Sequence, residues 1–224
     1  MADRVHGKNR GVWSRRVVVM VRDPVAGAVK TRLARGLGVG RATGFYRHAS
    51  RHVVERLLGD PRWETWLAVT PDSSIGTSFW PDARLRRAQG GGDLGQRMQR
   101  LMDDMPPGPL LIVGTDIPEI SPERVAKAFA VLGRADAVFG PAEDGGYWLV
   151  GLARRSAVPR LFRNVRWSTQ HTLADTEANL TGAVVEHVDR LDDVDEASSF
   201  AKLGPLGGRR VLPAGDGFTG RTDS

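Results

Sequence analysis

Short apolar runs that suit buried β-strands alternate along this chain with stretches of helical periodicity. The strand candidates are residues 16–21 (RVVVMV), 65–70 (TWLAVT), 84–88, 108–114 (GPLLIVG), 135–140, 145–152 and 183–188. Helical patterns occupy residues 30–58, as a short and a longer helix, and residues 94–105, 122–132, 156–162 and 168–180. Because such alternation builds sheets that helices cover on both faces, the sequence predicts an α/β fold with a mainly parallel sheet.

Two of these helices carry clear start signals. Ser121 followed by Pro122 is typical of a cap and a first helical position. The helix over 94–105 follows three glycines and presents one apolar stripe, which consists of Leu94, Met98, Leu101 and Met105. A stripe of this kind predicts that the helix packs on the sheet.

Length and composition favour one globular domain. The 224 residues are 41% hydrophobic and 26% charged, enough for one substantial core. We expect a single domain over residues 16–203, a disordered N-terminal extension over 1–15 and a disordered, Gly/Pro-rich tail over 204–224. The absence of cysteine excludes disulfides, thiolate nucleophiles and Cys-based zinc sites.

Charge and hydropathy narrow the classes of partner. The net charge of +6 suits an anionic ligand, yet the sequence has no dense basic block with interleaved aromatics, so nucleic-acid binding is not expected. No apolar run reaches about 18 residues, so no membrane span is predicted. The first residues carry charge without a hydrophobic segment, which makes the cytoplasm the expected location. Oligomeric state is not predicted.

Polar clusters follow most of the predicted strands, at residues 22–32, 90–97, 115–116 and 143–144. Parallel strands end at a common edge of the sheet, and ligands of α/β proteins bind outside the carboxyl ends of the strands. We therefore expect these clusters to lie at one edge.

The first cluster, PVAGAVKTRLA, offers Lys30 and Arg32 at the start of a helix. Two cations there oppose the helix dipole, which favours anions, so the arrangement suits a bound phosphate. The small residues Gly27 and Ala28 would let the backbone approach it closely. The alternative is a solvated helix start.

The acidic motifs each allow a functional and a structural role. In VGTDIPEI, Asp116 can hold Mg²⁺ together with substrate phosphates, or cap the turn before Pro118. In GGGDLGQRM, Asp93 can bind ribose or base, or serve as the helix N-cap. In GPAEDGGYWLVGL, Asp144 can bind a sugar hydroxyl or act as general base, whereas the aromatic residues after it can stack on a ligand or pack as a strand. Asp193 or Asp195 can supply a second metal carboxylate, or the acidic run can cap a helix.

Taken in order, PVAGAVKTRLA, GDLGQRM, VGTDIPEI, GPAEDGGYWLVGL, WST and LDDVD resemble the DUF2064 family of GT-A-like transferases. This family is also labelled rSAM/selenodomain-associated transferase 1 or arsenosugar-biosynthesis glycosyltransferase-like. The resemblance covers about residues 17–200 and implies the three-layer sandwich of the nucleotide-diphospho-sugar transferases. A more distant similarity links the opening loop to 2-phospholactate guanylyltransferases.

The resemblance implies three groups of site residues. Those for the nucleotide and its phosphates are Pro24, Gly27, Lys30, Thr31, Arg32, Gly92, Asp93, Arg97 and Thr115; those for the acceptor or sugar are Glu143, Asp144, Gly145, Gly146, Tyr147, Trp167, Ser168 and Thr169; and the metal ligand is Asp116, to which the acidic run itself adds Asp193 as a second candidate. The chain departs from the family pattern at Arg22-Asp23-Pro24, where a Lys before the Pro is usual, and at Ile117 and Glu119, where Cys and Asp are common.

These features predict a metal-dependent glycosyltransferase. Asp116 with Mg²⁺ or Mn²⁺ would bridge the diphosphate of a nucleotide sugar, Lys30 and Arg32 would stabilise the leaving nucleoside diphosphate, and Asp144 would orient or deprotonate a small-molecule acceptor. Nucleotidyl transfer from a nucleoside triphosphate is the close alternative, because the same groups serve both reactions. A nucleotide-binding module without catalysis is the alternative from another class.

Overall fold

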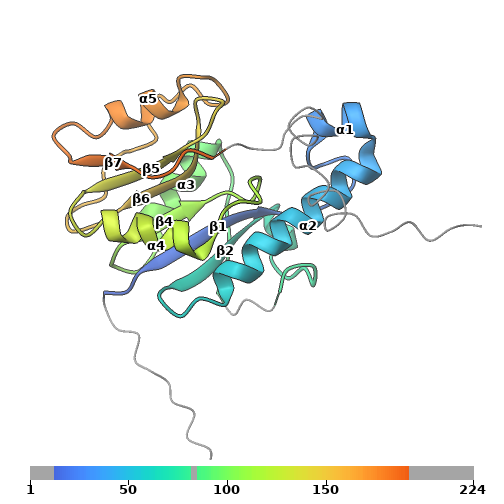
Figure 1. Ribbon diagram of the computed structural model, residues 1–224, viewed down its shortest axis with the longest axis horizontal. Helices are drawn as coiled ribbons and strands as arrows, with labels where there is room; N and C mark the ends of the chain where they lie inside the picture. The colour runs from blue at the N-terminus through green and yellow to red at the C-terminus, as the bar shows by residue number, and fades with distance from the viewer. Residues whose placement is uncertain (1–12, 82–84, 192–224) are drawn as a thin grey trace, which may run out of the picture. The chain divides into compact units, whose positions relative to one another are not determined.

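The computed structural model describes residues 13–81 and 85–191 (Figure 1). Its contacts define two compact units: residues 24–49 form one, and residues 13–23 with 50–191 form the other. The single domain expected over 16–203 stays a prediction, and the disorder expected for residues 1–12 and 204–224 concerns residues outside the described ranges.

The helices and strands follow one another as the alternation of patterns predicts. They are β1 (Arg16–Arg22), α1 (Thr31–Leu37), α2 (Val39–Leu58), β2 (Glu64–Thr70), the 3₁₀ turn η1 (Asp72–Ser74), β3 (Arg86–Ala88), α3 (Leu94–Asp104), β4 (Leu110–Val113), α4 (Pro122–Val131), β5 (Ala137–Pro141), β6 (Tyr147–Leu152), α5 (Thr172–Ala178) and β7 (Val185–His187).

Within the described residues the strands form a seven-stranded sheet of order β3-β2-β1-β4-β6-β5-β7. β1 to β4 run parallel, β6 runs antiparallel to its neighbours β4 and β5, and β7 is parallel to β5. The mainly parallel sheet is confirmed. Its reversed strand is possible because a short turn joins β5 to β6, whereas a parallel neighbour would need a long crossover.

The sequence of β1 explains why helices cover both faces of the sheet. Val17, Val19 and Val21 belong to one hydrophobic cluster, whereas Val18 between them belongs to a second. Successive side chains on a strand point to opposite faces, so an unbroken run of valines fits a strand that is buried on both sides.

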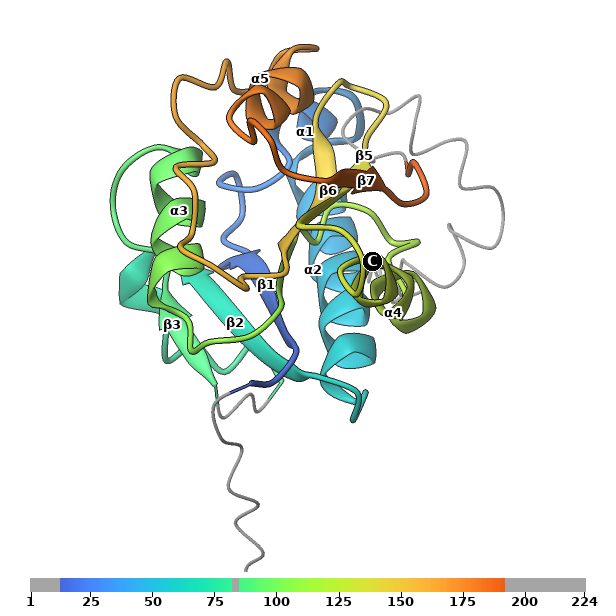
Figure 2. The same ribbon diagram turned by 90° about the vertical axis from the view of Figure 1, so that its left-hand side faces the viewer.

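Each face of the sheet has its own layer of helices. The first cluster joins the sheet to α4 and to residues 53–57 of α2, and the second joins it to α3. Figures 1 and 2 show α4 and α3 on opposite sides of the strands. The three-layer α/β sandwich expected from the family resemblance is therefore confirmed.

The predicted helix starts agree with the structure, but the apolar stripe of α3 does not agree fully. Ser121 caps α4 by accepting a hydrogen bond from the Arg124 backbone N–H, and Pro122 occupies the first turn. On α3, Met98 and Leu101 are buried, whereas Leu94 is exposed. Leu94 lies in the first turn, before the helix reaches the core.

Two predicted helices in the C-terminal half need correction. Residues 156–162 form turns and irregular backbone, not a helix. Pro159 cannot donate a backbone hydrogen bond there, and the apolar side chains of Leu161 and Phe162 are buried without helical structure. The helix expected over 168–180 is shorter in the structure, where it consists of α5 alone. The Thr169 hydroxyl binds the backbone of Arg166 and His171 in the turn that precedes α5, and these bonds compete with helical ones.

Residues just before β1 also contact the sheet. The carbonyl of Arg15 accepts a hydrogen bond from Glu64 N at 3.0 Å, and the Arg15 guanidinium lies 5.6 Å from the centre of the Phe129 ring. Ser14 and Arg15, which were expected to belong to a disordered extension, thus have defined contacts.

The smaller unit has a core of its own. Leu33 of α1 packs with Ala42, Phe45 and Ala49 of α2. Gly38, with φ of 83°, separates the two helices. The predicted pair of a short and a longer helix is confirmed.

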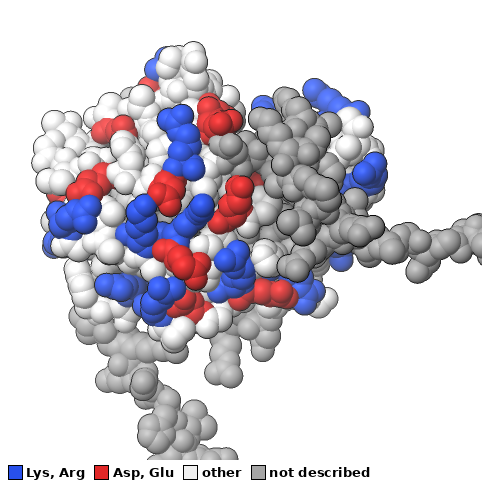
Figure 3. All heavy atoms as spheres, in the orientation of Figure 1, with Lys and Arg blue, Asp and Glu red and all other residues white. Residues whose placement is uncertain are grey.

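Basic and acidic side chains intermingle on the surface. On the face in Figure 3 blue and red groups alternate. Ion pairs within the larger unit include Lys127–Asp189 and Arg134–Glu186. Within the described residues, no helix has the length and apolar character needed to cross a bilayer.

We expect Gly151→Ala to destabilise the protein, because a Cβ there would lie 2.2 Å from Leu111 Cδ2 and 2.9 Å from Val138 Cγ1. The expected loss in the free energy of unfolding is about 1–3 kcal/mol, measured by urea denaturation. Gly44→Ala is the matched control, because a Cβ at this helical position would meet nothing within 4 Å. It should stabilise by about 0.5–1 kcal/mol. Equal effects of the two changes would contradict the packing described for β6.

Candidate functional site

The strand pairing brings the polar segments of the larger unit to one edge of the sheet. β1, β2, β3 and β4 end there, so Arg22, Asp72, Gly90 and Thr115, which follow or end these strands, all lie at that edge. Since β6 runs antiparallel, with Leu149 opposite both Val113 and Gly140, the turn over 142–146 lies at the same edge. The clusters at 90–97, 115–116 and 143–144 are thus brought together.

The neighbouring strands β1 and β4 mark the place where the topology changes direction. From β1 the chain adds β2 and β3 on one side, and then returns to place β4 on the other. In open α/β sheets, ligands bind outside the carboxyl ends of two such strands. Arg22 at the end of β1 and Asp116 after β4 therefore flank the position where a ligand is expected.

Asp116 is held at this position by apolar neighbours in the chain. Thr115, Ile117 and Ile120 are buried, whereas Asp116 is exposed. The buried isoleucines anchor the loop after β4 and leave the carboxylate at the surface of the edge. Among residues 13–81 and 85–191 there is no group of three side chains suited to hold a metal ion.

Gln89, which the sequence analysis did not single out, joins three elements under this edge. Its buried Nε2 donates to Val21 O at 3.1 Å and Ala68 O at 2.8 Å, and its Oε1 accepts from Arg97 Nη1 at 2.9 Å. Because both amide hydrogens bind carbonyls of β1 and β2, the amide oxygen must face Arg97. The sequence gives no distinctive signal for this role, because Gln89 is a single polar residue directly after a short strand.

Arg97, predicted to contact the nucleotide, is half-buried on α3. Burial lowers the pKa of its guanidinium, and the positive charge of Arg22 lowers it further. Its Nε donates to Asp93 O at 3.3 Å and one Nη1 hydrogen is used by Gln89. Its other N–H groups donate to no acceptor in the described part of the chain. An anion would supply the missing acceptors and offset the repulsion between the two arginines.

The Gly-rich loop over 90–93 is fixed by side chains around it. Asp72 Oδ1 accepts from Gly90 N at 3.0 Å, and Arg100 donates to Gln89 O at 2.6 Å and to Gly91 O at 3.1 Å. Asp93 Oδ1 accepts from Gln96 N at 2.8 Å in a capping box. Asp93 is thus the N-cap of α3, and its contact with the nucleotide stays a prediction. Gly92, which was predicted to contact the nucleotide, has φ of 96°.

The turn between β5 and β6 carries the two exposed acids Glu143 and Asp144. Asp144 Oδ1 accepts from Gly146 N at 2.8 Å, which orients its carboxylate. Gly145 has φ of 84°, and a Cβ there would lie 2.4 Å from the backbone of Gln170. The turn therefore requires glycine at this position and lies directly against the segment before α5.

The two aromatic residues after this turn pack as part of the sheet. The Tyr147 ring lies 5.4 Å from that of Phe139, and burial raises the pKa of the Tyr147 hydroxyl. Trp148 is 4% exposed and donates to Asp189 O at 3.0 Å. Both rings thus pack as part of the strand, and the contact of Tyr147 with an acceptor or sugar stays a prediction.

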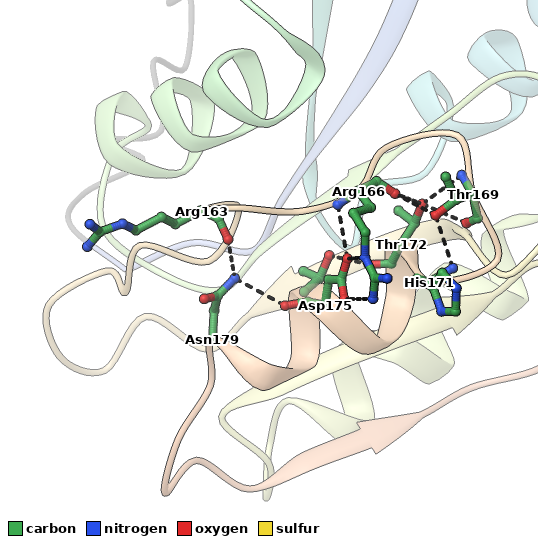
Figure 4. A network of polar contacts seen from close by, with 8 residues as sticks. Arg163, Arg166, Thr169, His171, Thr172, Asp175 and Asn179 are labelled. Carbon is green, nitrogen blue, oxygen red and sulfur yellow. Dashed lines mark hydrogen bonds and ion pairs between the residues drawn. The ribbon is translucent and has the colours of Figure 1, made fainter.

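The segment over 166–172 is tied down by a polar network, shown in Figure 4. Arg166 binds both oxygens of Asp175 at 2.8 Å, and Thr169 Oγ1 donates to Arg166 O at 2.8 Å. Ser168 adopts φ of 58°. Trp167 packs on α3, where a Cβ on Gly95 would lie 2.8 Å from its ring. The predicted residues Trp167, Ser168 and Thr169 thus connect the start of α3 with the turn at Gly145.

Asp175 predicts a pH dependence of stability. Its hydrogen bonds with Arg166 hold the pKa of the carboxyl well below its usual value. A lowered folded-state pKa contributes stability above the unfolded-state pKa, and this contribution is lost as the pH falls. Asp175→Asn should therefore be less stable than the native chain at pH 7, with the difference shrinking below about pH 4. Urea denaturation between pH 7 and 2 measures this; a constant difference would contradict the role of the ion pair.

In the smaller unit, the predicted phosphate loop has an unusual backbone. Lys30, the residue before α1, adopts φ of 48° and ψ of 46°, and Gly27 has φ of 80°. Pro24 is buried, whereas Thr31 and Arg32 are exposed. A left-handed conformation costs about 1–2 kcal/mol in a residue with a side chain, and such strain is typical of functional sites.

Solved structures define the class of fold. A provisionally named nucleotide-diphospho-sugar transferase from Desulfovibrio desulfuricans G20 has a TM-score of 0.74 and 28% identity, with 87% of each chain covered. A CMP:2-keto-3-deoxy-manno-octonic acid synthetase complexed with CTP has a TM-score of 0.52 and 14% identity, covering 88% of this chain and 99% of the other. A 4-diphosphocytidyl-2C-methyl-D-erythritol synthase from Anaerococcus prevotii DSM 20548 has a TM-score of 0.52 and 10% identity, covering 84% and 94%. The fold is that of the nucleotide-diphospho-sugar transferases.

The family follows from the sequence. The chain belongs to the DUF2064 family, described as an uncharacterized protein conserved in bacteria, whose profile matches residues 53–169. The resemblance found in the motifs is thereby confirmed. No curated protein matches the chain.

Proposed function

We propose that this protein is a metal-dependent transferase that takes a sugar from a nucleotide-diphospho-sugar and passes it to a small-molecule acceptor. The proposal rests on what meets at one edge of the sheet: the exposed Asp116, the guanidinium of Arg97 with unused donors, and the acidic turn over 142–146. The likeness to the Desulfovibrio desulfuricans G20 protein, at 28% identity, supports it. Nucleotidyl transfer is the alternative that the experiment below separates.

Arg97 and Arg22 would bind the phosphates in the larger unit. Gln89 sets the direction of Arg97, so its free N–H groups are oriented before the ligand arrives. Donors fixed in advance stabilise developing negative charge without reorganisation during the reaction. They would act on the nucleoside diphosphate as the sugar leaves. In the smaller unit, Lys30 and Arg32 would also bind phosphate.

Asp116 would hold the metal ion, Mg²⁺ or Mn²⁺. Mg²⁺ in proteins is often held by one or two carboxylates, with waters and substrate phosphates completing its octahedron. A single exposed carboxylate at the end of β4 fits an ion that is shared with a diphosphate. When bound, the ion would offset charge on the leaving group. Asp193, predicted as a second ligand, lies outside the described residues.

Asp144 would orient or deprotonate the acceptor hydroxyl. One of its oxygens is engaged by Gly146 N, and the other accepts no hydrogen bond from residues 13–81 or 85–191. Glu143 adds a second exposed carboxylate in the same turn. Thr169 and Ser168, which lie in the segment packed against Gly145, would help to shape this side of the site.

We expect Asp116→Asn to remove the metal-dependent part of ligand binding. The measurement is the thermal shift of the protein with nucleoside di- and triphosphates and nucleotide sugars, each with and without Mn²⁺. A ligand at about 100 times its Kd stabilises by about 2.7 kcal/mol, a shift of several degrees. Glu119→Gln, an exposed acid in the same loop, is the matched control and should keep the shift.

The ligand that gives the shift separates the two reactions. A metal-dependent shift with one nucleotide sugar supports glycosyl transfer. A shift with a triphosphate alone, followed by pyrophosphate release when an acceptor is added, would replace it with nucleotidyl transfer. An unchanged metal-dependent shift in Asp116→Asn would contradict both.

Lys30→Ala should weaken nucleotide binding by about tenfold or more, because a charge-assisted hydrogen bond is worth about 1.5–3 kcal/mol. The urea midpoint should change little. Arg35→Ala, an exposed cation in the last turn of α1, is the matched control and should bind normally.

Lys30→Gly sharpens this test, because glycine adopts the left-handed conformation without strain. This variant should be more stable than the native chain by about 1 kcal/mol and still lose nucleotide affinity. Normal nucleotide affinity in both Lys30 variants would show that the strained residue serves the fold alone.

A further inference from the structure

A cleft of about 590 Å³ lies beside α3 in the larger unit, at a place that none of the predicted site residues occupies. The residues on α3 that line it are Gly95, Gln96, Gln99, Arg100, Asp103 and Asp104, and the facing wall is formed by Arg160, Phe162 and Arg163. Small-molecule sites commonly have volumes of about 300–1,000 Å³. The cleft is therefore large enough for a metabolite.

The charges in this cleft are not balanced. Asp103 pairs with Arg160 at 3.0 Å, and Asp104 pairs with Arg87 at 3.3 Å, so both acids already have a cationic partner. The Arg100 guanidinium binds only the neutral carbonyls of Gln89 and Gly91 in the described part of the chain. The cleft thus keeps positive charge that its own acids do not neutralise.

Arg163 is the second source of this charge. Its main chain is fixed, because its carbonyl accepts a hydrogen bond from Asn179 Nδ2 at 2.8 Å. Figure 4 shows its side chain extended away from the network around Asp175. Its guanidinium has no hydrogen-bond or ion-pair partner among the residues that the structure describes. A cation on an anchored backbone, without a partner, is suited to bind a ligand anion.

Two side chains that line the cleft also bind the backbone of the Gly-rich loop. Arg100 lines the cleft and donates to Gly91 O, and Gln96 lines it and accepts from Asp93 N through Oε1 at 3.1 Å. A ligand in the cleft would therefore lie one side chain away from the loop that we assign to the nucleotide.

We propose that this cleft binds one end of the acceptor, while Asp144 orients the reacting hydroxyl at the other end, and that the bound end carries an anionic group, a phosphate or a carboxylate, next to an apolar part. This inference rests on the proposed transferase function. Arg163 and Arg100 would bind the anionic group, and Phe162 with the backbone of Gly95 would contact the apolar part. Because the two acids of the cleft are already paired with Arg160 and Arg87, the positive charge that remains would favour an anionic acceptor over a cationic one.

The experiment titrates the full chain with phenyl phosphate, benzoate and the neutral benzyl alcohol by isothermal titration calorimetry, with and without a saturating nucleotide. We expect one of the two anions to bind at least about tenfold more tightly than the alcohol. Arg163→Gln should weaken anion binding by a similar factor, while Arg190→Gln, an exposed arginine after β7, should bind normally. Circular dichroism shows whether both variants fold.

The outcomes separate this inference from the proposed function. Tighter binding of phenyl phosphate would indicate a phosphorylated acceptor, and tighter binding of benzoate a carboxylated one. Normal anion binding in Arg163→Gln, equal binding of the alcohol, or displacement of the anion by the nucleotide would overturn the inference, even if nucleotides bind as proposed. Arg163-dependent anion binding in a protein that binds no nucleotide would support the anion site and overturn its role for an acceptor.

Discussion

Both amide hydrogens of Gln89 bind main-chain carbonyls, and the orientation of Arg97 at the candidate site depends on these two hydrogen bonds. One hydrogen binds the end of β1 and the other binds β2, so the amide cannot rotate without breaking a buried hydrogen bond. Its oxygen is left with one direction, and Arg97 occupies it. The carbonyls of β1 and β2 thus fix, through Gln89, the position of the Arg97 guanidinium on α3. A preorganised cation costs less to use than a mobile one, because its side chain is already ordered before a ligand binds.

Much of the fold follows from the sequence because its signals are local. Unbroken apolar runs such as Val17–Val18–Val19 fit only a strand with both faces buried, and Ser121 with Pro122 marks a helix start by its own hydrogen bonding. The direction of parallel strands then places their following loops at one edge. For this reason the order of the strands and loops along the chain is enough to predict that the Gly-rich loop, Asp116 and the acidic turn lie near one another.

The remainder depends on contacts between segments distant in sequence. The helical pattern over 156–162 failed because Leu161 and Phe162 are buried by the tertiary structure, without helical backbone. Gln89 was overlooked because a single glutamine after a three-residue strand has no distinctive pattern, and its role depends on Val21 and Ala68. The cleft beside α3 was overlooked for the same reason: one wall lies about sixty positions further along the chain than the other.

The reversed strand β6 has a consequence for how such proteins can diversify. Because β6 runs against β4 and β5, only the turn over 142–146 is needed between two strands at the ligand edge, and its ends are fixed by the ladder on both sides. A turn anchored in this way can change length and composition without disturbing the strands that carry Arg22 or Asp116. Substitutions in the acidic turn can therefore occur independently of substitutions at the ends of β1 and β4. A common scaffold could thus change the carboxylates at this edge by exchanging one turn, while the strand ends on the other side stay as they are.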